Sequence, residues 1–165
     1  MKTIEQLEQF MTEPSTMLVE DMKKIDGDIL VLGIAGKMGP TLAKMAKRAV
    51  EEAGVEKRII GVARFSNPEM KEELERAGIE TITCDLLDEA QLAQLPDVKN
   101  VIFMAGNKFG TVNNEHFTWA MNTYVPGRVA DKYKNSNIVV FSSGNIYPFS
   151  PVTAGNCSED VTPIP

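Results

Sequence analysis

Short, mostly apolar runs alternate with helical patterns along most of the chain. Between the runs, apolar residues recur at three- and four-residue spacing, as they do on one face of a helix. Short apolar strands separated by helices indicate a parallel sheet covered on both faces. The pattern therefore predicts an α/β fold, a doubly wound sheet in three layers. The five predicted strands are residues 29–32, 58–63, 81–84, 100–105 and 137–141.

A helical pattern also precedes the first strand. Ile4, Leu7, Phe10 and Met11 recur at helical spacing, and Ser15 is suited to cap a second helix that ends before residue 27. Stripes of this kind, rich in methionine, are typical of a core or of a surface where subunits pack. We therefore predict N-terminal helices that are additional to the α/β fold.

The first strand runs directly into a glycine-rich turn, in which Gly33, Gly36 and Gly39 lie three residues apart and Pro40 follows. The first glycine permits a tight turn, the second lets the backbone approach a pyrophosphate, and the third lets the next helix pack closely. Proline suits a first helical turn, and a helix N-terminus offers free N–H groups to phosphate. The turn predicts dinucleotide binding in a Rossmann fold. A glycine turn with no ligand remains the alternative.

Other chemically suggestive residues also follow predicted strands. Arg64 follows the second strand, Asp85 the third, Gly106 the fourth and Ser143 the fifth. Ligands of doubly wound sheets bind at the carboxyl ends of the strands. The shared position of these residues favours nucleotide binding over a simple turn.

Composition fits one nucleotide-binding domain over residues 28–165, preceded by a helical extension over residues 1–27. The chain has 165 residues and a net charge of −6, which argues against nucleic acid as a partner. No apolar run approaches the roughly 20 residues that span a bilayer, and no signal peptide is evident, so we expect a cytoplasmic protein without a membrane partner. Cys84 and Cys157 fit reduced thiols, and the single His116 excludes a multi-histidine metal site. We expect no metal.

These motifs resemble the extended branch of the short-chain dehydrogenase/reductase family, which includes nucleotide-sugar epimerases and dehydratases. The resemblance covers about residues 28–165 and implies an NAD(P)-binding Rossmann domain. The motifs that carry it are the glycine turn, Asp85-Leu86, Ala105-Gly106, Asn122, and Ser142-Ser143 followed by Tyr147.

The resemblance implies specific contacts with the cofactor. Asp85 would accept a hydrogen bond from the adenine amino group, with Leu86 beside it; the alternative for Asp85 is a helix N-cap. Met38 would pack under the cofactor or into the core. Ala105 and Gly106 are small enough for the cofactor to pass over them, or they form only a tight turn.

The end of the second strand bears on the choice of cofactor. NAD sites place a carboxylate there, whereas this chain has Arg64, Ser66 and Asn67, with no acid before Glu69. An arginine matches a 2′-phosphate in charge and in hydrogen-bonding geometry, and Lys37 could add positive charge. We therefore favour NADP and leave NAD open. The alternative is that Arg64 stacks on the adenine or faces solvent.

The resemblance also implies a catalytic centre. Ser143 matches the family's catalytic Ser/Thr, and Asn122 would brace the site or be an exposed helix residue. The family's Tyr-x-x-x-Lys pair is absent from the sequence. We therefore expect the N-terminal part of a longer enzyme and, if strands are missing, an exposed apolar edge after the fifth strand. The three tyrosines are followed four residues on by other types: Tyr124 by Arg128, Tyr133 by Asn137 and Tyr147 by Pro151.

Two functional hypotheses follow. The first is the cofactor-binding part of an NAD(P)-dependent epimerase, dehydratase or reductase with a small-molecule substrate, a nucleotide sugar being one candidate, and a homodimer as one option. The second is a non-catalytic sensor or protein-interaction module that binds NAD(P). A Rossmann-like methyltransferase fits poorly, because it explains neither Ser142-Ser143 nor the basic end of the second strand.

Overall fold

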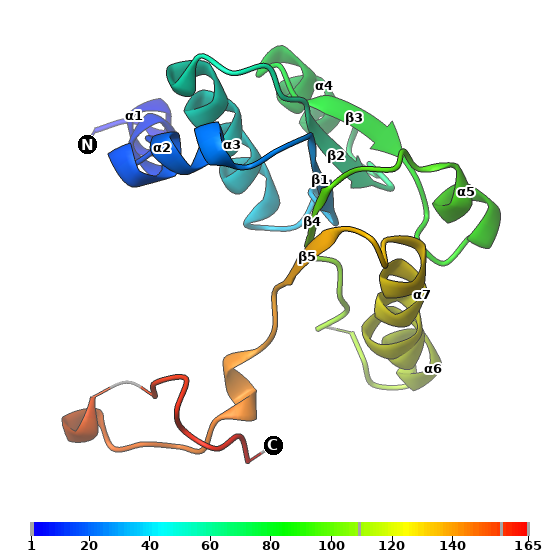
Figure 1. Cartoon of the computed structure of the whole chain (residues 1–165). Helices are drawn as coiled ribbons and strands as arrows, with labels where there is room; N and C mark the ends of the chain where they lie inside the picture. Colours follow the sequence, from blue (N-terminus) through cyan, green and yellow to red (C-terminus); the bar gives the residue numbers. More distant parts are fainter. Residues whose placement is uncertain (1, 109, 156, 165) are drawn as a thin grey trace.

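A computed structural model describes residues 2–108, 110–155 and 157–164 of the chain (Figure 1). Helices and strands alternate from β1 onwards, and two helices precede β1. The elements in order are α1 (Ile4–Met11), α2 (Thr16–Lys24), β1 (Ile29–Leu32), α3 (Gly39–Ala53), β2 (Ile59–Ala63), α4 (Pro68–Arg76), β3 (Glu80–Thr83), α5 (Glu89–Gln94), β4 (Asn100–Phe103), α6 (Glu115–Trp119), a π-helical turn (Ala120–Tyr124), α7 (Val125–Lys132), β5 (Asn137–Val140) and two 3₁₀ turns (Gly144–Ile146 and Val152–Ala154).

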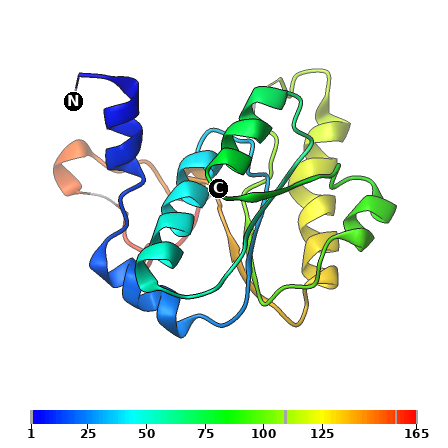
Figure 2. The same cartoon turned by 90° about the horizontal axis from the view of Figure 1, so that it is seen from above.

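The strands form one parallel sheet in the order β3-β2-β1-β4-β5. From the central strand β1, the chain adds β2 and β3 on one side and then β4 and β5 on the other. The strand order therefore reverses between β1 and β4. Seen from above, α3 and α4 lie on one side of the sheet and α7 on the other (Figure 2). This is the doubly wound, three-layer α/β fold that the sequence predicts, and its N-terminal helices are present as well. Ligands of such sheets bind where the strand order reverses.

Each face of the sheet has its own core, because successive strand residues point to opposite faces. Leu30 and Leu32 of β1 join a cluster with α5 and α7, whereas Ile29 and Val31 join one with α2, α3 and α4. Tyr133 closes the first cluster: its ring is buried and its hydroxyl donates to the carbonyl oxygen of Pro96 at 3.1 Å. Burial, followed by the charges of Asp97 and Cys84, raises the pKa of this phenol.

The helical stretch between β4 and β5 is interrupted, with the π-helical turn between α6 and α7. Val125 donates its N–H to the carbonyl oxygen of Ala120, five residues back, which defines the π turn. Pro126 follows in the first turn of α7 and has no N–H to donate. The proline thus accounts for the shift in hydrogen-bond register. Such turns are frequent at functional sites, and this one contains Asn122.

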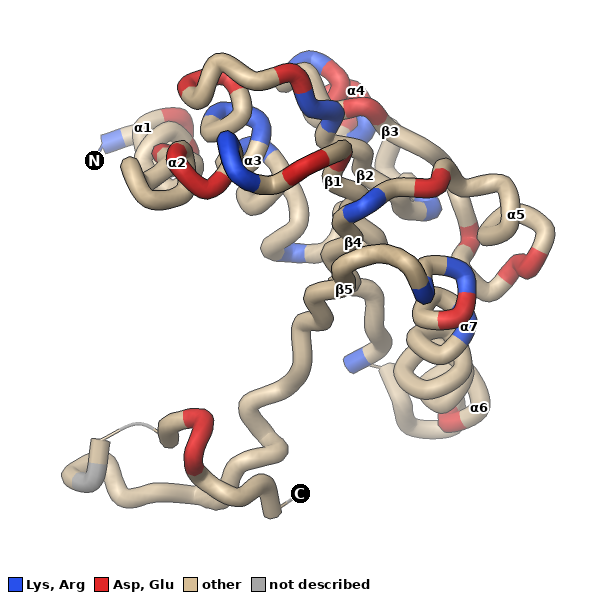
Figure 3. Tube along the Cα trace, viewed as in Figure 1, with Lys and Arg blue, Asp and Glu red and all other residues tan. Residues whose placement is uncertain are grey.

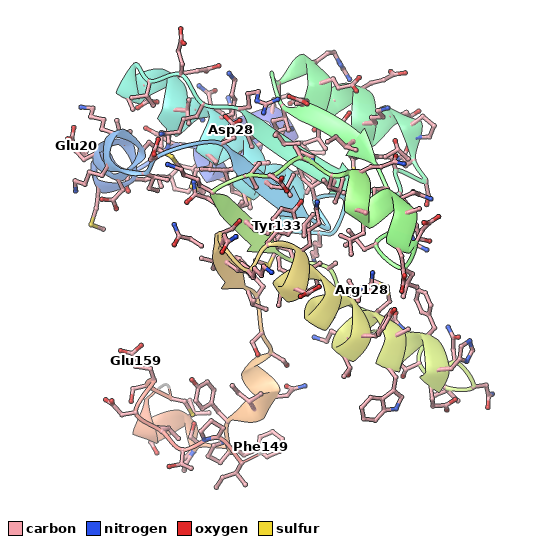
Figure 4. All side chains as sticks on the ribbon, turned by 45° about the vertical axis from the view of Figure 1, so that its right-hand side comes forward. Glu20, Asp28, Arg128, Tyr133, Phe149 and Glu159 are labelled. Atoms are coloured by element: carbon pink, nitrogen blue, oxygen red, sulfur yellow. The ribbon has the colours of Figure 1, made fainter. Side chains whose placement is uncertain are left out.

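The predicted apolar edge is present at β5, which among the described residues pairs with β4 alone. Val139 and Val140 are more than half exposed, and Phe141 is 43% exposed. The chain beyond Phe141 extends away from the α/β body (Figure 1), and Phe149 lies far from the sheet (Figure 4). Basic and acidic residues are interspersed over the body, whereas the charged residues between positions 142 and 164 are all acidic (Figure 3).

Ser15 caps α2 as predicted, accepting a hydrogen bond from the N–H of Leu18. Leu18, Val19, Met22 and Ile25 pack against the core on the α3 side. Nowhere in the described part of the chain is a helix both long and apolar enough to cross a bilayer.

Asp28, at the start of β1, is expected to make stability depend on pH. Burial by itself raises the pKa of this carboxyl, but its bonds with the backbone N–H and guanidinium of Arg58, 2.7–2.8 Å long, outweigh burial and lower it. The stabilisation is therefore present above the unfolded pKa of about 3.9 and is lost as pH falls through the lower folded value.

We accordingly expect Asp28→Asn to lower stability at pH 7 by about 1 kcal/mol, or roughly 2–4 °C in the unfolding midpoint. It should also flatten the fall in midpoint between neutral pH and pH 3, measured by thermal unfolding. Asp131→Asn is the control, because Asp131 is exposed and has no hydrogen-bond partner in the described ranges. An unchanged acid limb in Asp28→Asn would contradict the prediction.

Candidate functional site

A pocket of about 380 Å³ lies at the carboxyl ends of β1, β2, β3 and β4. It spans the point where strand order reverses. The π turn adds Met121, and α4 adds Met70. Of the residues predicted from the sequence, the pocket brings together Gly33, Gly36, Arg64, Asp85, Leu86, Ala105 and Gly106.

The glycine turn has two crowded positions and one open one. Gly33 adopts φ of +87°, and a Cβ there would lie 2.6 Å from the backbone nitrogen of Ala105. A Cβ on Gly39 would lie 2.0 Å from the carbonyl oxygen of Ile34, so Gly39 lets α3 pack against the turn. A Cβ on Gly36 would meet only the carbonyl oxygen of Gly33, at 3.4 Å. Gly36 is therefore not required by packing, and its free side faces the pocket.

The N-terminus of α3 follows this turn with its N–H groups uncapped. Met38 occupies the N-cap position without a side-chain hydrogen bond, Pro40 lies in the first turn, and that turn contains no acidic residue. Lys37 is exposed and Met38 is 55% exposed, so burial of Met38 in the core is wrong. Lys37, Met38 and Gly39 do not line the pocket itself.

Arg64 follows β2 and lines the pocket. It is exposed and, among the described residues, has no hydrogen-bond or ion-pair partner. The next residue, Phe65, is buried and holds φ of +46°, a left-handed conformation that is strained for a side chain of this size. Asn67 then caps α4 by accepting from the N–H of Glu69. The loop is thus fixed on both sides of an arginine that remains available to a ligand.

Asp85 and Leu86 follow β3. Asp85 accepts from the N–H of Leu87 through Oδ1 at 3.0 Å, and its own N–H donates to Gln91. The N-cap of α5 is Asp88, so the alternative of Asp85 as a helix cap is wrong. The neighbouring Cys84 also lines the pocket. Burial, with the charges of Asp85 and Asp88, raises the pKa of its thiol and so disfavours the thiolate form.

Ala105 and Gly106 follow β4, and the loop beyond them is held by the long helix. Asn122 accepts from the backbone N–H of Asn107 at 2.7 Å and donates to its carbonyl oxygen at 2.8 Å. The side chain of Asn107 in turn donates to Thr118. Asn122 therefore braces the loop that follows β4 and is not merely an exposed helix residue. No motif or spacing in the sequence indicates the partners Asn107 and Thr118.

Ser143 is not brought to the pocket. It lies beyond β5, where its hydroxyl accepts from the N–H of Asn145 at 3.2 Å in a 3₁₀ turn. The following chain folds on itself, with the N–H of Ile164 donating to the carbonyl oxygen of Ile146. The catalytic role of Ser143 remains a prediction.

The strand order and the pocket at its reversal define the class of protein, an α/β domain of the Rossmann type. The chain belongs to the NAD dependent epimerase/dehydratase family, whose model matches residues 29–164. This confirms the resemblance to the extended short-chain dehydrogenases/reductases and makes nicotinamide dinucleotide the cofactor class of the domain. The comparison with curated proteins gave no match.

Solved structures show the same fold at low sequence identity. ADP-L-glycero-D-manno-heptose-6-epimerase of Helicobacter pylori has a TM-score of 0.63 and 17% identity, over 84% of this chain and 45% of that one. UDP-glucuronic acid 4-epimerase of Bacillus cereus, in complex with NAD, has a TM-score of 0.60 and 22% identity over the same shares. A ketoreductase of phoslactomycin biosynthesis from Streptomyces has 0.56 and 21%, over 71% and 31%. The chain thus spans less than half of each of these proteins.

Proposed function

We propose that the pocket binds NADP in preference to NAD and forms the cofactor-binding part of an enzyme that acts by hydride transfer. The observation that carries the proposal is a pocket built from four successive strand ends, with an open glycine at one wall and an unpartnered arginine at another. The family supports the cofactor class, while the preference for NADP rests on Arg64.

The residues present fit such a cofactor. The uncapped N-terminus of α3 and the free side of Gly36 would hold the pyrophosphate. Asp85 and Leu86 would flank the adenine, and Arg64 would pair with the 2′-phosphate through its forked donors. Lys37, Met38 and Gly39 lie just outside the lining, where Lys37 would contribute charge to the same phosphates.

Ala105 and Gly106 would let the remaining half of the cofactor pass over the end of β4, next to the loop that Asn122 holds through Asn107. When bound, the nicotinamide supplies a carbon that accepts or donates hydride. Ser143 is proposed to hydrogen-bond the substrate oxygen. The sequence holds no Tyr-x-x-x-Lys for the accompanying proton transfer, so these residues alone are not expected to turn over substrate. Nucleotide sugars are the proposed substrate class, and the cytoplasm the proposed location.

The test is a titration of the chain with NADPH and NADH, followed by nicotinamide fluorescence and thermal unfolding. A ligand at a hundred times its Kd should stabilise by about 2.7 kcal/mol, which is roughly 5–10 °C for a chain of this size. NADPH should bind more tightly. Tighter NADH binding would keep the site and reverse the preference, and binding of neither would contradict the proposal.

Arg64→Ser should weaken NADPH binding by about 10- to 100-fold, the value of one or two charge-assisted hydrogen bonds, and change NADH binding by less than about threefold. Lys134→Ser is the matched control, because Lys134 is an exposed cation outside the pocket lining and has no partner among described residues. Equal losses for both cofactors would show that Arg64 stacks on the adenine.

A non-catalytic sensor or interaction module is the second candidate. Two observations favour it: Ser143 lies away from the pocket, and the sequence lacks the Tyr-x-x-x-Lys pair. Both candidates predict cofactor binding, so hydride exchange with a substrate in a protein that contains this pair would separate them.

A further inference from the structure

The α1 helix carries its apolar side outward. Ile4, Leu7, Phe10 and Met11 lie along one side of it, and none of its residues is buried. Ile4 is 80% exposed and Phe10 64%. Leu7 is 43% exposed and Met11 48%, and we define these four residues as the outer face of α1. A helix of a folded domain ordinarily turns such a stripe toward the core, so this face needs a partner.

Polar contacts fix the opposite side of α1 against α3. Lys44 forms ion pairs with both Glu8 and Glu73, and its side chain is only 13% exposed. Arg48 donates from Nη1 to the carbonyl oxygen of Gln9 and to the hydroxyl of Thr12, both at 2.9 Å. Thr12 itself is buried.

The charge of Lys44 is stabilised in this arrangement. Burial alone lowers the pKa of its ammonium, but the hydrogen bonds and charges of Glu73 and Glu8 outweigh burial and raise it. The helix is therefore tied to the body through its polar side. Rolling it to bury the apolar stripe would break these contacts, so the outward orientation is part of the fold.

We propose that the outer face of α1 is a homodimer interface, in which α1 of one copy packs antiparallel to α1 of a second copy. The pattern is self-complementary about a two-fold axis at Leu7: each Leu7 meets its counterpart, and Ile4 of one copy lies opposite Phe10 of the other. The proposal does not depend on cofactor binding.

The charges at the two ends of α1 favour a second copy of the chain as the partner of this face. Lys2 precedes the positive end of α1 and Glu13 follows its negative end, so an antiparallel pair brings opposite charges together at both ends. A membrane fits less well, because helices that lie on anionic lipid carry lysine or arginine on their polar side. α1 has Glu5 and Glu8 and no basic residue between Ile4 and Met11.

The test is sedimentation velocity of the full 165-residue chain from micromolar to submillimolar concentration. We expect a concentration-dependent dimer. Leu7→Glu should weaken association by at least about tenfold. Gln6→Glu is the matched control, an exposed neighbour off the apolar stripe that gains the same charge, and should associate as the parent chain does. Circular dichroism of both variants checks that they remain folded.

Charge reversal tests the antiparallel arrangement. Lys2→Glu and Glu13→Lys should each weaken the dimer, and the double variant should restore it. A dimer that Leu7→Glu leaves intact would overturn the proposal. Loss of the dimer on Val139→Lys, with Leu7→Glu unaffected, would assign association to the β5 edge and overturn it as well.

A chain that stays monomeric throughout would also overturn the proposal. Binding of that monomer to phosphatidylcholine–phosphatidylserine vesicles, lost on Leu7→Glu, would identify a membrane as the occupant of the face instead.

Discussion

Gly36→Val is expected to abolish binding of both NADPH and NADH while the chain stays folded. Gly36 lines the pocket, and its φ is not left-handed. The nearest described atom to a Cβ built on it is the carbonyl oxygen of Gly33, at 3.4 Å. The valine methyl groups would then occupy the space in which a pyrophosphate meets the backbone of the turn. We expect affinity to fall by at least about 100-fold.

The measurement combines fluorescence titration with the unfolding midpoint of the unliganded protein, which should move by no more than about 2 °C. Gly144→Val is the control for adding the same side chain at an open glycine away from the pocket, since nothing lies within 4 Å of its Cβ position. Retained affinity in Gly36→Val would remove the glycine turn from the cofactor site.

Gly39→Ala, three residues further along the same turn, should have the opposite consequence and destabilise the fold. Alanine in place of a helical glycine ordinarily stabilises a protein, by up to about 1 kcal/mol. Here the new Cβ would lie 2.0 Å from the carbonyl oxygen of Ile34, a backbone atom that cannot swing aside. We expect a loss of about 3 kcal/mol or more, or roughly 10 °C in the unfolding midpoint.

Thermal and urea unfolding measure this loss. Gly127→Ala in α7 is the matched control, because it is also a helical glycine and no atom lies within 4 Å of its Cβ position. That variant should be as stable as the parent chain or slightly more so. Similar stabilities for Gly39→Ala and Gly127→Ala would refute the close packing of α3 on the turn.

The sheet and its pocket could be anticipated because their signals are local. An apolar run such as residues 29–32 needs two covering layers, and parallel strands bring their carboxyl ends to one edge of the sheet. Residues at those ends, including Arg64 and Asp85, are therefore predictable as members of one pocket. The match to the family model confirms the fold, and the role of each residue toward the cofactor stays a prediction.

Other features depend on contacts between distant segments and leave no local signal. Periodicity in α1 locates an apolar stripe but not its direction, which is decided by Lys44 and Arg48 on α3. The left-handed backbone conformation at Phe65 could not be predicted, because it occurs at neither a glycine nor an asparagine. Ser143 fits a motif, yet its position depends on what packs beside β5, and a motif does not specify that.

The contact between Asn122 and Asn107 can also be regarded as an extra rung of the sheet, supplied by a side chain. A carboxamide offers one donor and one acceptor, as a peptide group does, and Asn122 uses both on a single residue just past the end of β4. The loop after β4 is thereby paired with the π turn of a helix at a point where β4 itself has ended. Because Met121 of the same π turn lines the pocket together with Ala105 and Gly106, this contact joins the helix to one wall of the pocket.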